Sequence, residues 1–198
     1  DEFKGIWEPI IQSADKLAQN KIINIDNVLQ QFMYINRSKE RQYSEGELTT
    51  PGVRKYYTVL YPELLETPDS LCDKFSKILL IWDKIQSYSI VKLMMKFNEN
   101  FKLFLISYLF RIPENEITES NITPIVECLL RLFALLEVGD YSYSSRYFKT
   151  FLFNENFKLV DEAYKIEGIL EDFNKHISST WKEEDVLTDL MEYDKNIL

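Results

Sequence analysis

The hydrophobic pattern predicts a chain of helices organised around residues 123–139, TPIVECLLRLFALLEVG. The helix is expected to begin at Thr123, with Pro124 in the first turn, where a missing N–H group costs nothing, and to end at Gly139. Its few charged residues are Glu127, Arg131 and Glu137. A helix that is apolar on nearly all sides is either buried or in a membrane, and this one is too short and too charged to span a bilayer. The pattern therefore predicts a core helix with neighbours packed around it.

Most of the remaining chain repeats apolar residues at three- and four-residue spacing, which is typical of amphipathic helices. This spacing and the helix start and stop signals predict further helices at residues 6–18, 26–35, 51–60, 70–86, 87–112, 154–176 and from 180 onwards. The expected N-terminal caps are Asp26, Ser87 or Ser89, and the capping boxes Ser70 with Asp73 and Thr180 with Glu183. Asn98 and Asn100 are expected to kink or divide the 87–112 helix. A short strand is the alternative at residues 56–61, but helix is favoured because no second strand is there to pair with it.

The predicted fold class is all-α, with about eight to nine helices in a single domain over residues 1–198. The helices are expected to stack as hairpins, in a HEAT-like or irregular α-solenoid or in a compact multi-helix bundle. The pattern does not choose between these architectures. Residues 36–50, NRSKERQYSEGELTT, are much more polar than their surroundings and predict a mobile loop.

Composition narrows the class of protein and of partner. A hydrophobic content of 45% favours a globular protein, and a net charge of −9 argues against duplex DNA as the main partner. Cys72 and Cys128 lie in predicted helices among apolar neighbours, so we expect buried free thiols and an intracellular protein, in the cytoplasm or the nucleus. The chain shows no signal peptide or transmembrane run and does not begin with Met, which favours a domain excised from a larger protein. Sequons at Asn36 and Asn121 keep a secreted helical glycoprotein as an alternative.

The sequence offers little catalytic chemistry. His176 is the single histidine, placed near a helix end, and no Cys/His zinc spacing or glycine-rich phosphate loop is present. The neighbouring carboxylates at Asp161–Glu162, Glu171–Asp172 and Glu183–Asp185 diverge around a helix and predict solvated faces. We therefore expect no enzyme, no cofactor, no metal site and no catalytic residue.

An aromatic segment at residues 140–153, DYSYSSRYFKTFLF, is the first candidate binding surface. Tyrosines are favoured where a ring is buried and its hydroxyl stays wet, and cations often flank such interfaces. The candidate partner-binding residues are Tyr141, Tyr143, Tyr147, Arg146 and Lys149. We expect the three tyrosine rings to be exposed and to dock an acidic or amphipathic segment. The alternative is that two neighbouring helices share these rings.

A second, basic candidate comprises Arg37, Lys39, Arg41, Arg54 and Lys55, which would engage a phosphorylated or acidic tail. Two segments, KILLIWDKI around Trp82 and PIIQSADKLAQ near the N-terminus, resemble stretches of the CTD-interacting domains. That resemblance implies a helical peptide-binding module that reads phosphorylated polymerase tails. The stretch between the two segments is too short for the middle helices of that fold.

The sequence thus favours a non-catalytic α-helical protein–protein interaction domain, a scaffold or adaptor from a larger intracellular eukaryotic assembly. The runner-up function is a module that reads an acidic or phosphorylated peptide. The expected partner is another protein or a peptide segment.

Overall fold

The computed structural model describes residues 2–40, 52–95, 99–138 and 144–180. All regular structure in these ranges is helical, which confirms the all-α prediction. The α-helices are α1 (Glu2–Gln19), α2 (Ile25–Glu40), α3 (Val53–Lys55), α4 (Pro68–Ile85), α5 (Ser89–Met94), α6 (Glu99–Leu109), α7 (Glu119–Val138), α8 (Ser145–Lys158) and α9 (Ile166–Thr180). Short turns of other helix types cover Tyr56–Leu60, Pro62–Leu65 and Glu114–Glu116. No helix within the described ranges has both the length and the apolar character needed to cross a membrane.

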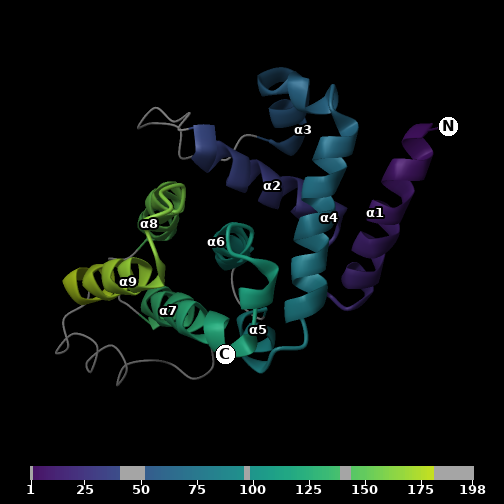
Figure 1. Cartoon of the computed structure of the whole chain (residues 1–198). Coiled ribbons are helices and arrows are strands. Elements are labelled where there is room, and N and C mark those ends of the chain that lie inside the picture. The colour runs from purple at the N-terminus through teal and green to yellow at the C-terminus, as the bar shows by residue number, and fades with distance from the viewer. Residues whose placement is uncertain (1, 41–51, 96–98, 139–143, 181–198) are drawn as a thin grey trace.

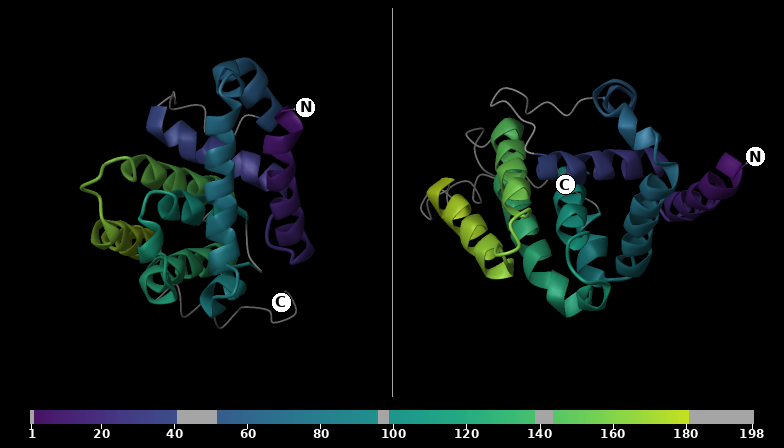
Figure 2. Two further views of the ribbon diagram at one scale, coloured as in Figure 1. Left: turned by 45° about the vertical axis from the view of Figure 1, so that its right-hand side comes forward. Right: turned by 45° about the horizontal axis from the view of Figure 1, so that its top comes forward.

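The helices pack largely on their next-but-one neighbours in sequence, as stacked helical hairpins do. Helix α2 contacts α4, α5 contacts α7, α6 contacts α8, and α7 contacts α9. Helices farther apart in sequence also contact each other, among them α1 with α4 and α2 with α6. Helix α6 is seen end-on near the middle of Figure 1, and α1 and α9 lie at opposite edges there and in both views of Figure 2.

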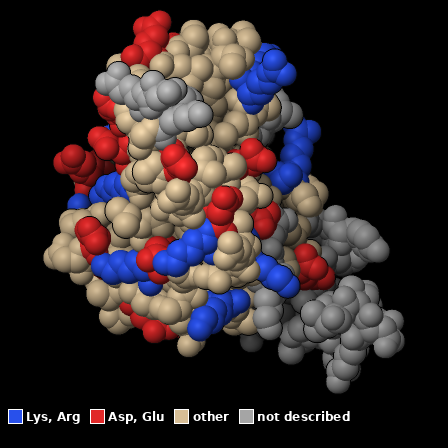
Figure 3. Space-filling model, turned by 90° about the vertical axis from the view of Figure 1, so that its right-hand side faces the viewer, with Lys and Arg blue, Asp and Glu red and all other residues tan. Residues whose placement is uncertain are grey.

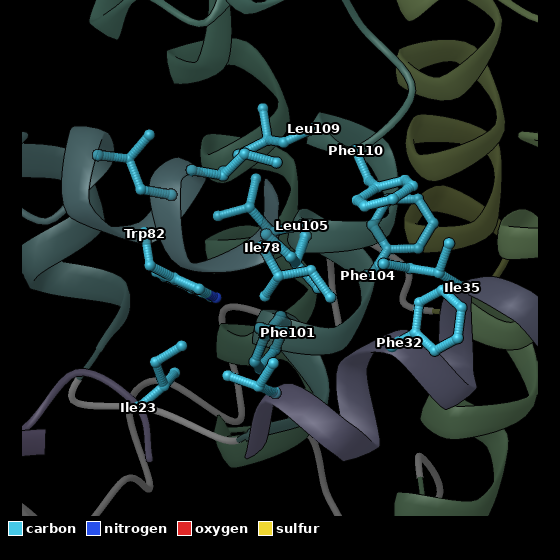
Figure 4. Close-up of a cluster of buried hydrophobic side chains, with 14 of the residues drawn as sticks. Ile23, Phe32, Ile35, Ile78, Trp82, Phe101, Phe104, Leu105, Leu109 and Phe110 are labelled. Carbon is cyan, nitrogen blue, oxygen red and sulfur yellow. The ribbon is translucent and has the colours of Figure 1, made fainter. Parts of the chain in front are cut away.

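Helix α6, rather than the predicted core helix at residues 123–139, is the centre of the fold. Every residue from 101 to 107 is buried, whereas α7 keeps an exposed stripe that includes Glu127 and Arg131. Figure 4 shows Phe101, Phe104 and Leu105 among side chains from α2 and α4. Helix α6 is enclosed because α2, α4, α7 and α8 all contact it.

The α4 face toward this core follows from its sequence. Its buried residues recur at helical spacing: Leu71, Cys72, Phe75, Ile78, Leu79, Ile81, Trp82 and Ile85. Trp82 is completely buried and its indole Nε1 donates a hydrogen bond to Gln31 Oε1 of α2 at 2.8 Å. A buried indole N–H left without a partner would be costly, so this bond fixes α2 against α4.

Helix α7 begins earlier than predicted, at Glu119 instead of Thr123. Pro124 therefore lies inside the helix, beyond its first turn, and Thr123 Oγ1 donates to the Glu119 carbonyl at 2.7 Å. The Glu119 carboxylate accepts a hydrogen bond from the backbone N–H of Ser89 at 2.8 Å and so caps the start of α5. Leu132 is fully buried as expected, but Phe133 is only half-buried.

The start of α2 and its end both differ from the prediction. Asn24 rather than Asp26 caps the helix, because the side chains of Asn24 and Asn27 each accept the other's backbone N–H, at 2.9 and 3.0 Å. Helix α2 runs to Glu40, so residues 36–40 of the predicted 36–50 loop are its last turn. The rest of that segment, residues 41–50, lies outside the described residues.

The structure also tests the remaining helix predictions. The 87–112 helix is divided into α5 and α6, as its asparagines indicated, and residues 53–60 are helical rather than a strand. The Ser70–Asp73 capping box was wrong, because α4 already begins at Pro68. The single helix predicted at 154–176 was also wrong: α8 ends at Lys158 and α9 begins at Ile166. Thr180 is the last residue of α9. Glu183 and the rest of the helix predicted from residue 180 onwards lie outside the described residues.

Candidate functional site: a groove between α1 and α4

Helices α1 and α4 lie side by side and run in the same direction (Figure 1). The Trp7 and Phe75 rings meet edge to face with centroids 5.8 Å apart. Farther along, Lys16 Nζ lies 3.8 Å from Asp83 Oδ1. Near the helix ends, the Asn20 amide donates to Gln86 Oε1 at 3.1 Å. These contacts set the register of α1 against α4 along its whole length.

The two helices leave a half-open groove of about 600 Å³ between their outer faces, which we call the α1–α4 groove. From α1 it is lined by Ile6, Pro9, Ile10, Ser13, Lys16 and Leu17, and from α4 by Asp69, Cys72, Asp73, Ser76, Leu79, Leu80 and Asp83. The floor is formed by buried apolar side chains, among them Ile10, Leu17 and Leu79. Small side chains, Ser13 and Ser76, occupy the middle and leave space between the helices.

Leu80 is a large exposed apolar side chain at the edge of this groove. It is 64% exposed, although the neighbouring residues Leu79 and Ile81 of α4 are buried. An isolated exposed leucine is ordinary, but one that adjoins an apolar floor enlarges a continuous apolar surface. The groove therefore has the shape and chemistry of a site that buries an apolar side chain or helix face from elsewhere.

Cys72 lies on the floor of the groove, and Cys128 lies in α7. Both thiols are buried and neither forms a disulfide, as predicted. Burial raises the pKa of Cys72, and Asp69 and Asp73 raise it further. Burial also raises the pKa of Cys128. Because a protonated thiol is a poor nucleophile, these environments disfavour thiolate chemistry at either position.

The face of the molecule that carries α1 bears both signs of charge (Figure 3). Basic side chains form a band across its lower part and also lie at its upper right, and acidic ones are spread over the whole face. The groove itself is lined by three aspartates and one lysine. Its local charge is thus negative even where the surrounding face is mixed.

Only part of the predicted aromatic surface lies within the described residues. Tyr147 is 65% exposed, and Arg146 and Lys149 beside it are exposed too. Tyr141 and Tyr143 lie outside the described residues. The other aromatic and apolar residues of the segment serve the core, since Phe148, Leu152 and Phe153 are buried. Of the three predicted tyrosines, Tyr147 is the one that the structure describes. It lies in the first turn of α8 and points away from the core.

The predicted basic cluster is not one surface. Arg37 is buried in α2, and its guanidinium lies 5.7 Å from the centre of the Phe153 ring. Arg54 and Lys55 are exposed on α3. The side chains of Lys39 and Arg41 lie outside the part of the structure that can be described. Of the predicted basic residues, Arg54 and Lys55 are those that the structure shows to be accessible.

A charged cluster links α8 to α9 and was missed by the sequence, which predicted a solvated face for Asp172. The Glu155 carboxylate, 2% exposed, contacts Lys158 Nζ at 2.8 Å and the Tyr164 hydroxyl at 2.6 Å. Asp172 contacts the same two groups, at 2.8 Å and 2.5 Å. We call these four residues the α8–α9 clamp. Burial acts to raise the pKa of Asp172, but hydrogen bonds from Lys158 and Tyr164 lower it overall.

A second polar network, largely buried, joins α2, α6 and α8. Arg111 donates to Ser107 at 2.7 and 2.8 Å and to Ser38 Oγ at 2.6 Å. Ser107 donates to Asn156 Oδ1, and the Asn156 amide donates to the Tyr34 carbonyl at 3.1 Å. Burial lowers the pKa of Arg111 to about 10. These hydrogen bonds connect side chains of all three helices, so the network holds them together.

His176 and the sequons also have structural surroundings. The His176 ring stacks on Phe151 with centroids 3.8 Å apart, and burial lowers its pKa. The Asn36 amide is part-buried in α2 and donates to the Tyr56 hydroxyl at 3.0 Å, a position poorly suited to a glycan. Asn121 is exposed in α7. Across the described ranges, no group of three or more His, Cys, Asp or Glu side chains is arranged to hold a metal ion.

No protein-family model, curated protein or solved structure matches this chain. Function must therefore be argued from the groove, the exposed residues and their charges.

Proposed function

We propose that this chain is a non-catalytic protein–protein interaction domain, a scaffold module of a larger intracellular eukaryotic assembly, that docks a helical segment of a partner in the α1–α4 groove. The observation that carries the proposal is the open apolar groove with Leu80 exposed at its edge. A helix laid into a groove buries one apolar stripe and keeps its polar face in water.

The dimensions of the groove fit such a partner. The α4 residues that line it extend from Asp69 to Asp83. At 1.5 Å per residue this stretch is about 21 Å long, which matches a partner helix of about four turns. The α1 lining, from Ile6 to Leu17, is about 16 Å long by the same measure.

Tyr147 supports a second candidate surface, the one expected from the sequence. Its exposed ring is flanked by the exposed cations Arg146 and Lys149, a combination suited to an acidic segment. We rank this surface second because the described part of it contains one exposed ring and the neighbouring rings are committed to the core.

The proposal is tested by selecting displayed helical peptides of about 15 residues, the length that matches the groove, against the wild-type domain. Selected peptides are then measured against Leu80→Gln, which removes the apolar edge without adding charge. The matched control is Leu93→Gln, because Leu93 is an exposed leucine of α5 that does not line the groove.

We expect Leu80→Gln to weaken the selected peptides by about tenfold, the scale of one buried aliphatic anchor, and Leu93→Gln to leave them unchanged. Equal binding to wild type and to both variants would contradict the proposal, as would a selection that yields no binding peptide. Binding lost in Arg146→Ala and Lys149→Ala instead would favour the Tyr147 surface.

A further inference from the structure

The negative charge of the α1–α4 groove is concentrated at one end. Asp69 and Asp73, in the first turns of α4, are exposed, and neither forms an ion pair with any described residue. At the other end, Asp83 is paired with Lys16. Among the described residues, the groove therefore presents two carboxylates without an ion-pair partner where α4 begins, and a neutralised pair where the lining ends.

The two unpaired carboxylates are not equivalent. Asp69 lies in the first turn of α4, where it interacts favourably with the positive end of the helix dipole. Asp73 is one turn farther on, where that interaction has largely faded. Both carboxylates act on the groove floor, as their effect on the Cys72 thiol shows.

We infer that the occupant of the groove is a basic amphipathic helix, an inference that rests on the proposed function. Its apolar stripe packs on Ile6, Pro9 and Leu80, and its Lys or Arg side chains reach Asp69 and Asp73. An acidic helix would place like charges beside two unpaired carboxylates, which lowers both the association rate and the affinity.

The charge also argues against the chain's own C-terminal segment as the occupant. Residues 181–198 contain six acidic and two basic residues, so their sequence repeats the sign of the groove. A second copy of the groove face is disfavoured for the same reason. A partner segment rich in Lys or Arg is the complementary choice.

The test uses two designed helical peptides of about 15 residues with the same leucine stripe. One carries Lys and the other Glu at the positions that flank the stripe. Titration calorimetry measures both against wild type, Leu80→Gln, the double variant Asp69→Asn with Asp73→Asn, and Asp15→Asn. Asp15 is an exposed aspartate of α1 that does not line the groove, which makes it the matched charge control.

We expect the Lys peptide to bind more tightly than the Glu peptide, and the double variant to weaken the Lys peptide by roughly fivefold, the upper range for exposed charge pairs. Asp15→Asn should leave the affinity unchanged. The preference for Lys should shrink between about 0.1 M and about 1 M salt, because the screening length falls from about 10 Å to about 3 Å.

Failure of the inference can be separated from failure of the proposed function. Two peptides that bind equally well, and that both lose affinity in Leu80→Gln, would keep the groove as the site and overturn its preference for a basic partner. A Glu peptide that binds more tightly would overturn it as well. Two peptides that do not bind, or that bind wild type and Leu80→Gln alike, would overturn the groove itself.

Discussion

The α8–α9 pair and the α1–α4 pair are two helix contacts at opposite edges of the molecule. The first is joined by charged side chains, and the second leaves a groove open to solvent. Helices α8 and α9 are joined by the α8–α9 clamp, in which Lys158 and Tyr164 each contact both Glu155 and Asp172. Helices α1 and α4 are joined by apolar packing and by exposed polar contacts, and the α1–α4 groove stays open between their outer faces.

The difference separates a structural contact from a candidate binding surface. A buried charged group is expensive unless it meets a partner, and Glu155, the buried member of the clamp, meets both Lys158 and Tyr164, so these residues are committed to the fold. The groove leaves Leu80 next to water beside a buried apolar floor, and this exposure gives no benefit to the isolated chain. Apolar surface left open in this way is better explained by binding than by stability.

The largest expected effect on stability is at Leu132, in the buried face of α7, which packs on α9. Leu132→Ala should lower the free energy of unfolding by about 2–5 kcal/mol, because the side chain is fully buried and its loss leaves a cavity. Phe133→Ala should cost less, about 1.5–3 kcal/mol, because Phe133 is half-buried. Urea unfolding measures both. An equal or larger loss for Phe133→Ala would mean that α7 is oriented differently.

The second effect tests the clamp. Glu155→Ala should cost about 1–3 kcal/mol, since Tyr164 and Lys158 lose a buried acceptor. The matched control is Glu171→Ala on the exposed face of α9, which should change stability by at most about 0.5 kcal/mol. Thermal unfolding of the two variants gives the comparison, and similar losses would remove the clamp from the account.

The pattern of the sequence could predict the helices but not their places in the fold. Residues 101–112 and 123–139 are both apolar on nearly all sides, and which one lies at the centre depends on α2, α4 and α8 packing around α6. The break between α8 and α9 contains no glycine or proline, the residues that punctuate helices most strongly. For that reason the 154–176 helix was predicted as continuous.

The groove could not be predicted because its two walls are far apart in sequence and close only after folding. A weak signal was present in α4, where Leu80 adds an apolar residue next to the stripe that faces the core. The exposure of Tyr147 was expected from the sequence, and the structure supplies its reason: Phe148 and Leu152 face the core, whereas Tyr147 does not. The α8–α9 clamp was missed because Glu155 and Asp172 converge only through the α8–α9 turn.

The third effect is a pH dependence of stability that comes from the α8–α9 pair, through His176 and Asp172 of α9. Burial holds the pKa of His176 below its ordinary value of 6.5, so the unfolded chain takes up this proton at a higher pH than the folded one. The stabilisation is present above pH 6.5 and is lost as the pH falls below it. Asp172, whose pKa is also lowered, adds a further loss as the pH falls below its ordinary value of 3.8.

Urea unfolding of wild type and His176→Gln across this pH range measures the histidine contribution. The stability of wild type relative to His176→Gln should be greatest above pH 6.5 and should fall at lower pH. Two parallel curves would show that His176 titrates alike in the folded and unfolded chains.

The smallest effect on stability is expected at Leu80, at the edge of the α1–α4 groove. Leu80→Gln should change the free energy of unfolding by no more than about 0.5 kcal/mol, because the side chain is 64% exposed and glutamine is a good helix former. A loss above about 1.5 kcal/mol would mean that Leu80 contributes to the core, which would remove the reason to treat it as part of a binding surface.

The most direct test of the groove as a binding surface is a two-dimensional NMR titration of the domain with the Lys peptide. Shifted amide signals should map to residues 6–17 of α1 and 69–83 of α4, the two stretches that line the groove. Signals around Tyr147 at the start of α8 should stay unchanged. Shifts centred on Tyr147, with α1 and α4 unaffected, would contradict the account.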